Sequence, residues 1–259
     1  MPELPPGVLE AFALYLVRTS ALVLSSPLLG LSASFSGYKV ALIFSLSLLL
    51  YAVDGGALPP ETGTLAFGIM ALREILIGLF LSFVLLLFLL AVRVAGELIG
   101  HEMGFAMARQ IDPESGIQTP LVTRVYETFF LLALLAMDGH HWMIRALGES
   151  FARAPVGDVA LGGGTIDLAQ RLFSQMFAAG LTFAAPVMVL MVLVSILMGL
   201  LARVVPTLNV LEVGFSVRIA MALVAMFVFA PLMAPIMQEL GTRLFSALDL
   251  ATGSVASGA

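Results

Sequence analysis

The residues of this chain that could carry out chemistry do not complete a known hydrolase motif. His101-Glu102 begins the H-E-x-x-H pattern of zinc hydrolases, but Phe105 occupies the place of the second histidine. Gly148-Glu149-Ser150 begins like a serine-hydrolase elbow, and the residues that follow do not complete it. A phosphate-binding loop of the G-x-x-x-x-G-K-[ST] type is also missing. The sequence therefore predicts a protein without catalytic residues or a bound cofactor.

The histidines give little support for a metal site. His140 and His141 are adjacent, and neighbouring side chains on a helix point about 100° apart. With three histidines and no cysteine, the chain offers few of the ligands that zinc prefers. We predict no metal centre.

Charged residues within apolar segments are the next candidates for function. Arg18 interrupts the first apolar segment, and Arg73-Glu74 interrupts the third. Charges inside a membrane are costly, so they are usually paired or line a water-filled path. A structural ion pair and a proton or ion relay both remain open. A relay would be better supported by carboxylates at span centres, and the two longest uncharged runs contain none.

The composition places these charges in a membrane protein. Of 259 residues, 60% are hydrophobic and 11% are charged, against roughly 45–50% and about 25% in soluble domains. So few charges could not cover the surface of a soluble fold. The net charge is −5, and the twelve Lys and Arg residues form no basic patch, which argues against a nucleic-acid partner. We expect an all-α integral membrane protein in contact with lipid.

About six apolar segments can be distinguished, within a single predicted membrane domain covering residues 1–250. The second and fourth are short for a span of about 20 residues, and the fifth is longer than one perpendicular span requires. The small, polar residues 251–259 are predicted to form a disordered tail. The six segments are approximately 8–31, 40–53, 65–92, 125–137, 172–202 and 219–238.

Two features follow the third segment. Gly96, Gly100 and Gly104 are spaced four residues apart, so on a helix they form a smooth stripe that allows close packing, either within the chain or against another subunit. The stretch from His101 to Pro120 mixes Phe and Met with charged residues. We interpret it either as a re-entrant or plugging loop, in which Met would make a soft seal, or as a solvated connection.

The stretch ARVVPTLNVLEVGFSVRI, which starts at Ala202, resembles the FliR/SctT family of flagellar and type III secretion export proteins. Shorter family-like pieces occur in order along nearly the whole chain, including Gly139-His140 and Ser150-Phe151. The Val213-Gly214-Phe215 form is more similar to the flagellar branch, although Glu212 and Ser216 depart from the usual pattern. The motif residues, predicted to serve assembly, are Arg203, Pro206, Asn209, Val213, Gly214, Phe215 and Arg218.

The resemblance implies a hetero-oligomeric helical export gate in the bacterial inner membrane, at the flagellar basal body. FliP-like and FliQ-like subunits and an FlhB-like protein would be the partners, and unfolded flagellar proteins the substrates. The helices would be bent hairpins. The family's plug loop would correspond to residues 104–120, with candidate pore contacts at Gly104, Phe105, Met107, Arg109 and Ile111. An injectisome subunit of the same family and a stand-alone secondary transporter are the alternatives. Secondary transporters often contain internal repeats, and the two halves of this sequence show no convincing repeat.

Overall fold

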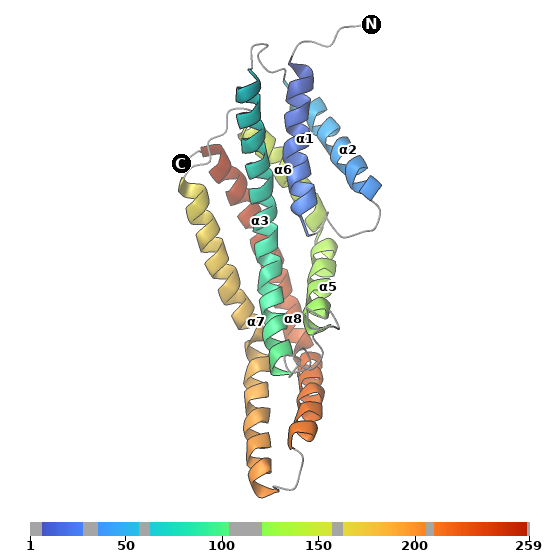
Figure 1. Ribbon diagram of the computed structural model, residues 1–259, viewed down its shortest axis with the longest axis vertical. Coiled ribbons are helices and arrows are strands. Elements are labelled where there is room, and N and C mark those ends of the chain that lie inside the picture. Colours follow the sequence, from blue (N-terminus) through green and yellow to red (C-terminus); the bar gives the residue numbers. More distant parts are fainter. Residues whose placement is uncertain are drawn as a thin grey trace. The chain divides into compact units, whose positions relative to one another are not determined.

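The computed structural model describes residues 7–27, 36–56, 63–103, 121–156, 163–205 and 210–257, and all regular structure within these ranges is helical (Figure 1). The predicted all-α class is confirmed. The helices of the described ranges are α1 (Val8–Ser25), α2 (Ser36–Asp54), α3 (Thr64–Glu102), α5 (Leu121–Ala136), α6 (Gly139–Arg153), α7 (Gly163–Val204) and α8 (Val210–Ser257).

Each of the six predicted apolar segments lies within one of these helices or overlaps it, whereas α6 lies between the fourth and fifth segments, where no apolar segment was predicted. Its sequence is amphipathic, since Met143, Leu147 and Ser150 recur on one buried face while Arg145 and Ala152 are exposed. α6 therefore packs as a helix through one face without being apolar enough to span a membrane.

Three described helices are long and apolar enough to cross a membrane: α1, α3 and the Gly164–Val204 part of α7. Shorter apolar runs occupy Gly37–Val53 of α2 and Val213–Phe229 of α8. With so few charges to cover them, these helices make the chain an integral membrane protein.

The ends of the last helix differ from the sequence prediction. α8 continues through Pro231 and Pro235 to Ser257, so the described part of the predicted disordered tail is helical. The small residues at its end explain the difference, because Ala251 and Thr252 are fully buried. Small side chains that look featureless in sequence allow this helix end to pack closely.

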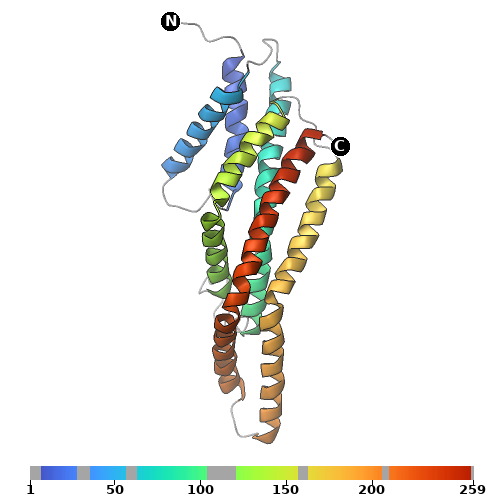
Figure 2. The same ribbon diagram turned by 180° about the vertical axis from the view of Figure 1, so that it is seen from behind.

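The described helices divide into two compact units. The first comprises residues 1–87, 135–173 and 242–259, and the second comprises residues 88–134 and 174–241. In the first unit, α1 packs against α2 and α2 packs against α6. Figure 2 shows α6 alongside the C-terminal part of α8, where Trp142 stacks on Phe245.

An aromatic cluster connects the helices of the first unit. Tyr15 of α1 stacks on Phe151 of α6, with ring centroids 4.1 Å apart and the planes 6° from parallel. Tyr51 from α2 meets both Tyr15 and Phe12 in edge-to-face geometry, at centroid distances of 5.5 and 5.7 Å. Such pairs add about 0.5–1.5 kcal/mol beyond the area that they bury. The cluster thus fixes α1 between α2 and α6.

Close contacts of glycine hold the second unit together. A methyl group added at Gly96 of α3 would lie 2.6 Å from the Cα atom of Thr123 in α5. One added at Gly180 of α7 would lie 2.7 Å from the carbonyl oxygen of Ala91 in α3. α5 and α7 therefore approach α3 more closely than a side chain at Gly96 or Gly180 would permit.

Candidate functional site

The most completely formed polar site in the described chain surrounds Arg18 in the first unit. Arg18 of α1 is fully buried and donates a hydrogen bond from Nε to the Oε2 atom of Glu74 in α3. It also donates to the Oγ atom of Ser150, at 3.3 Å, and to the carbonyl oxygen of Ala154, at 3.0 Å. One guanidinium group therefore joins α1 and α3 to the C-terminal end of α6.

The remaining face of the guanidinium group contacts an aromatic ring. The Cζ atom of Arg18 lies 4.1 Å from the centre of the Phe151 ring, and the same ring stacks on Tyr15. A cation over an aromatic ring gains about 2 kcal/mol when both are shielded from water. A fixed counter-charge, two neutral acceptors and a ring thus offset the cost of burying Arg18.

This geometry depends on Gly78, which lies one helical turn after Glu74 on α3. A Cβ atom there would be 2.5 Å from the carbonyl oxygen of Arg18 and 2.7 Å from the Cβ atom of Ala21. Without a side chain at residue 78, the two helices come close enough for Arg18 to reach Glu74. Gly78 was not among the residues predicted from the sequence, although its spacing of four residues from a carboxylate in an apolar segment was a usable signal.

Arg73 and Glu74, which the sequence presents as neighbours, have different environments. Glu74 is buried beside Arg18, whereas Arg73 is exposed. Successive residues on a helix point about 100° apart, so only one of them can face α1. The arrangement supports a structural ion pair rather than a relay, because the described groups in hydrogen-bond contact with Arg18, apart from Glu74, are a hydroxyl and a backbone carbonyl.

The glycine stripe is represented by two residues in the described ranges. Gly96 faces Thr123 of α5, which corresponds to packing within the chain, and Gly100 is also buried. A salt bridge from Arg93 to Glu127 joins the same two helices at a more exposed position. Gly104 lies outside the described residues.

The structure describes only part of the family-like motif. Val213 and Phe215 are exposed on α8, Gly214 between them is buried, Arg218 is half-buried, and Arg203 at the end of α7 is exposed. The added Cβ atom at Gly214 would be 3.6 Å from Met198 of α7, an ordinary contact. The remaining predicted site residues lie outside the described ranges: Pro206, Asn209, Phe105, Met107, Arg109 and Ile111.

The histidine pair is arranged differently from the prediction. The rings of His140 and His141 lie side by side, with centroids 4.1 Å apart, because side-chain rotation offsets the divergence of adjacent positions on the helix. One ligand atom from each histidine and from Asp138 lie within 4.8 Å of one another, so this group could hold a divalent cation. Asp138 and His141 are exposed and already hydrogen-bonded to each other at 3.2 Å.

Comparison with known proteins gives consistent matches over most of the chain. A family model described as bacterial export proteins, family 1, matches residues 9–244. The flagellar biosynthetic protein FliR of Escherichia coli (strain K12) is 29% identical, over 90% of this chain and 89% of its own length. The FliR proteins of Bacillus subtilis (strain 168) and Pectobacterium carotovorum subsp. carotovorum are each 30% identical, over 84% and 90% of this chain and 85% and 88% of their own lengths.

Proposed function

Because the chain belongs to the family of bacterial export proteins, family 1, we propose that it is a core pore-forming subunit of the flagellar type III protein export gate. This family supplies a non-enzymatic membrane component of the export apparatus. In this role the subunit would help to form the channel for unfolded flagellar proteins and to seal it when idle. The similarity to FliR proteins over about nine tenths of the chain favours the flagellar branch over the injectisome branch.

The apolar surface of α7 is the structural observation that best supports a role as a subunit. Only 28% of its most apolar window is buried inside the chain, compared with 61% for α3. The uncovered surface must meet lipid or other proteins. Its large exposed side chains include Val189, Val192, Leu193, Ile196, Leu197, Leu200 and Leu201.

The proposed partners are FliP-like and FliQ-like subunits and an FlhB-like protein, assembled in the bacterial inner membrane. A channel wide enough for an unfolded chain would dissipate the proton gradient unless it were closed between substrates. Apolar side chains around a constriction exclude water and ions, and a substrate entering the channel would shift the gate to an open state. We assign the seal to residues 104–120, with Phe105, Met107 and Ile111 as its apolar contacts and Gly104 and Arg109 as further pore contacts.

The subunit role can be tested by co-expression. The chain produced alone is expected to aggregate or be degraded, because its apolar helices lack their neighbours, and co-expressed FliP-like and FliQ-like proteins should restore it. A stable, monodisperse chain that transports a small solute in liposomes would instead support a secondary transporter.

The seal can be tested separately. Deleting residues 107–116 should make the assembled gate conduct small ions, measured as current across planar bilayers or as ion-dependent growth inhibition. As a control, deleting residues 158–162 shortens a different connection and should leave conductance at its unmodified value. Equal conductance of the 107–116 deletion and the unmodified gate would identify residues 104–120 as an ordinary connecting loop.

A further inference from the structure

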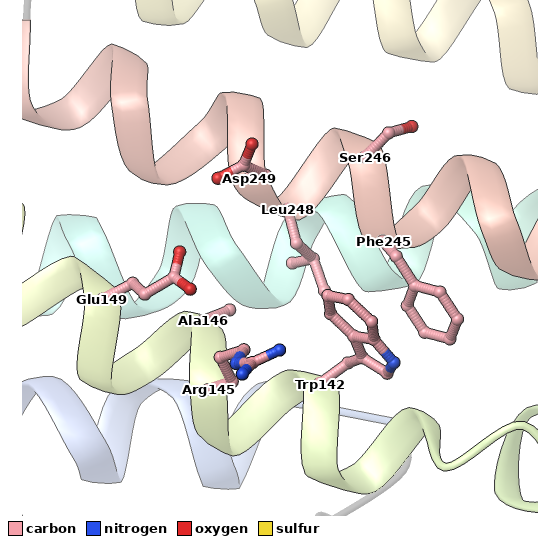
Figure 3. Close-up of a pocket in the computed structure, with 8 residues that line it drawn as sticks. All are labelled: Trp142, Arg145, Ala146, Glu149, Phe245, Ser246, Leu248 and Asp249. Carbon is pink, nitrogen blue, oxygen red and sulfur yellow. The ribbon is translucent and has the colours of Figure 1, made fainter.

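A small pocket in the first unit lies between α6 and the C-terminal part of α8 (Figure 3). Its volume is about 260 Å³, below the roughly 300–1,000 Å³ of sites that enclose a drug-sized ligand. Ala146 and Leu248 are its buried residues, and the small size of Ala146 leaves the space open. The pocket is therefore suited to a small group rather than to a large metabolite.

Contacts between α6 and α8 fix both ends of the pocket. At one end, Trp142 stacks on Phe245 with centroids 4.7 Å apart and planes 16° from parallel. At the other, Arg153 donates to the carboxylate and carbonyl oxygens of Asp249, at 2.7 and 3.1 Å, and to Thr252, at 3.0 Å. The walls are held before any ligand arrives, which lowers the entropic cost of binding.

The charges in the pocket are separated. Arg153 serves two carboxylates, Glu149 at 3.2 Å and Asp249 at 2.7 Å, so this end carries a surplus of negative charge. Arg145 lies with its guanidinium group 5.5 Å from the ring of Trp142, and within the described chain it forms no ion pair. Figure 3 shows Arg145 between Trp142 and Glu149. The pocket thus presents a free cation at Arg145, beside Trp142, and an excess of carboxylate where Arg153 joins Glu149 and Asp249.

We propose that this pocket binds the headgroup of a phospholipid that carries both a phosphodiester and a primary ammonium group, of the phosphatidylethanolamine type. Arg145 would bind the phosphate, and Glu149 and Asp249 would accept hydrogen bonds from the ammonium group. The rings of Trp142 and Phe245 would contact the glycerol and the first methylene groups. The proposal requires membrane residence and does not depend on a role in export.

A lipid fits better than a soluble zwitterion or a purely anionic headgroup. Trp and Tyr side chains favour the level of the headgroups, where one edge is wet and the other apolar. Leu250, adjacent to Asp249, is 59% exposed and offers an apolar surface for acyl chains. An anionic headgroup would gain from Arg145 but would be repelled by the two carboxylates, which share a single arginine.

The test uses Trp142, the only tryptophan of the chain, as a probe inside the pocket. The full chain, with its co-purifying partners, is reconstituted in phosphatidylcholine nanodiscs that contain increasing fractions of phosphatidylethanolamine brominated near the start of its acyl chains. Subtracting the emission of a Trp142→Phe sample isolates the signal of the probe. Quenching should saturate at a lipid fraction about tenfold below that needed with brominated phosphatidylcholine or phosphatidylglycerol.

Each of the other possible results would overturn the proposal. Equal quenching by the three lipids would indicate general lipid contact, and stronger quenching by phosphatidylglycerol would indicate an anionic site; both overturn the proposal. An unquenched Trp142 would mean that a protein covers the pocket. Loss of quenching on addition of millimolar soluble phosphoethanolamine would identify a soluble ligand instead.

Two variants locate the effect in the pocket. Arg145→Gln should remove the preference for the ethanolamine headgroup, whereas Arg171→Gln, at an exposed position on α7 outside the pocket, should retain it. If both variants retain the preference, the headgroup is bound elsewhere. Should Arg145→Gln fail to fold, the comparison of the three lipids on the unmodified protein still decides the proposal.

Discussion

Gly78 lies directly against the backbone of Arg18, so closely that a single methyl group on residue 78 would be 2.5 Å from the carbonyl oxygen of Arg18. The same approach of α1 to α3 brings the guanidinium group of Arg18 to Glu74 one turn away. A glycine and a buried ion pair therefore form one structural unit. Gly78 allows α1 and α3 to approach closely, and the ion pair between Arg18 and Glu74 stabilises this approach.

We first predict that Gly78→Ala destabilises the protein, despite the better helix propensity of alanine. Alanine gains about 1 kcal/mol in a helix, but the clash is with backbone atoms that cannot move independently, and overpacking of this kind costs about 1–3 kcal/mol. The measurement is the thermal unfolding of the purified assembly in detergent. Gly68→Ala on the same helix is the matched control, since an added Cβ there meets nothing within 4 Å. A lower melting temperature for Gly68→Ala than for Gly78→Ala would refute this account.

Second, we predict that removing one member of the buried ion pair is worse than removing both. Glu74→Gln or Arg18→Gln leaves an unpaired charge or a mismatched polar group in a site closed to solvent, at a cost of about 3–5 kcal/mol. The double variant Arg18→Met with Glu74→Met should recover part of that loss. Denaturant titration of the three variants tests the order.

The exposed pair provides the comparison for this second prediction. The side chain of Arg93 is 52% exposed, so Arg93→Met, which breaks its bond to Glu127, should cost less than about 1 kcal/mol. If Arg93→Met and Glu74→Gln lowered stability equally, burial would not be the decisive factor.

Third, we predict that Gly96→Ala separates α5 from α3. Its Cβ atom would lie 2.6 Å from the Cα atom and 2.9 Å from the hydroxyl oxygen of Thr123. The chain has no native cysteine, so a Thr123→Cys substitution at this fully buried position can report the opening by its rate of maleimide labelling. Labelling should be several-fold faster when Gly96→Ala is added. Adding Gly199→Ala, where a Cβ meets nothing within 4 Å, should leave the rate unchanged.

Fourth, we predict that Phe215 contributes to binding a partner subunit. It is 37% exposed beside the buried Gly214, within the family-like motif, and large aromatic side chains at interfaces often cost 2 kcal/mol or more when truncated to alanine. Phe215→Ala should reduce the yield of partner subunits on an affinity-tagged chain severalfold. Phe227→Ala, on the same helix and 83% exposed, should not reduce it if Phe227 faces lipid. The reverse pattern would place the interface at Phe227.

The amino-acid sequence alone was sufficient for the class of protein and for its apolar helices. A chain with 60% hydrophobic and 11% charged residues must be covered by lipid or neighbours, and helices satisfy their own backbone hydrogen bonds there. Each predicted apolar segment corresponds to a helix for this reason. The family-like motif after Ala202 was also readable, and the match over residues 9–244 confirms that identification. The pore contacts proposed for residues 104–120 stay predictions.

The partners of individual side chains were decided by the tertiary structure. The sequence presents Arg73 and Glu74 together, but Glu74 pairs with Arg18, 56 residues away, because adjacent positions on a helix face different neighbours. Ser150 and the carbonyl group of Ala154 complete that site from α6, a helix too polar to be found by hydropathy. Composition and periodicity indicate which residues of each segment must be shielded from water. Which segments meet, and at what distance, follows only from packing, as at Gly78.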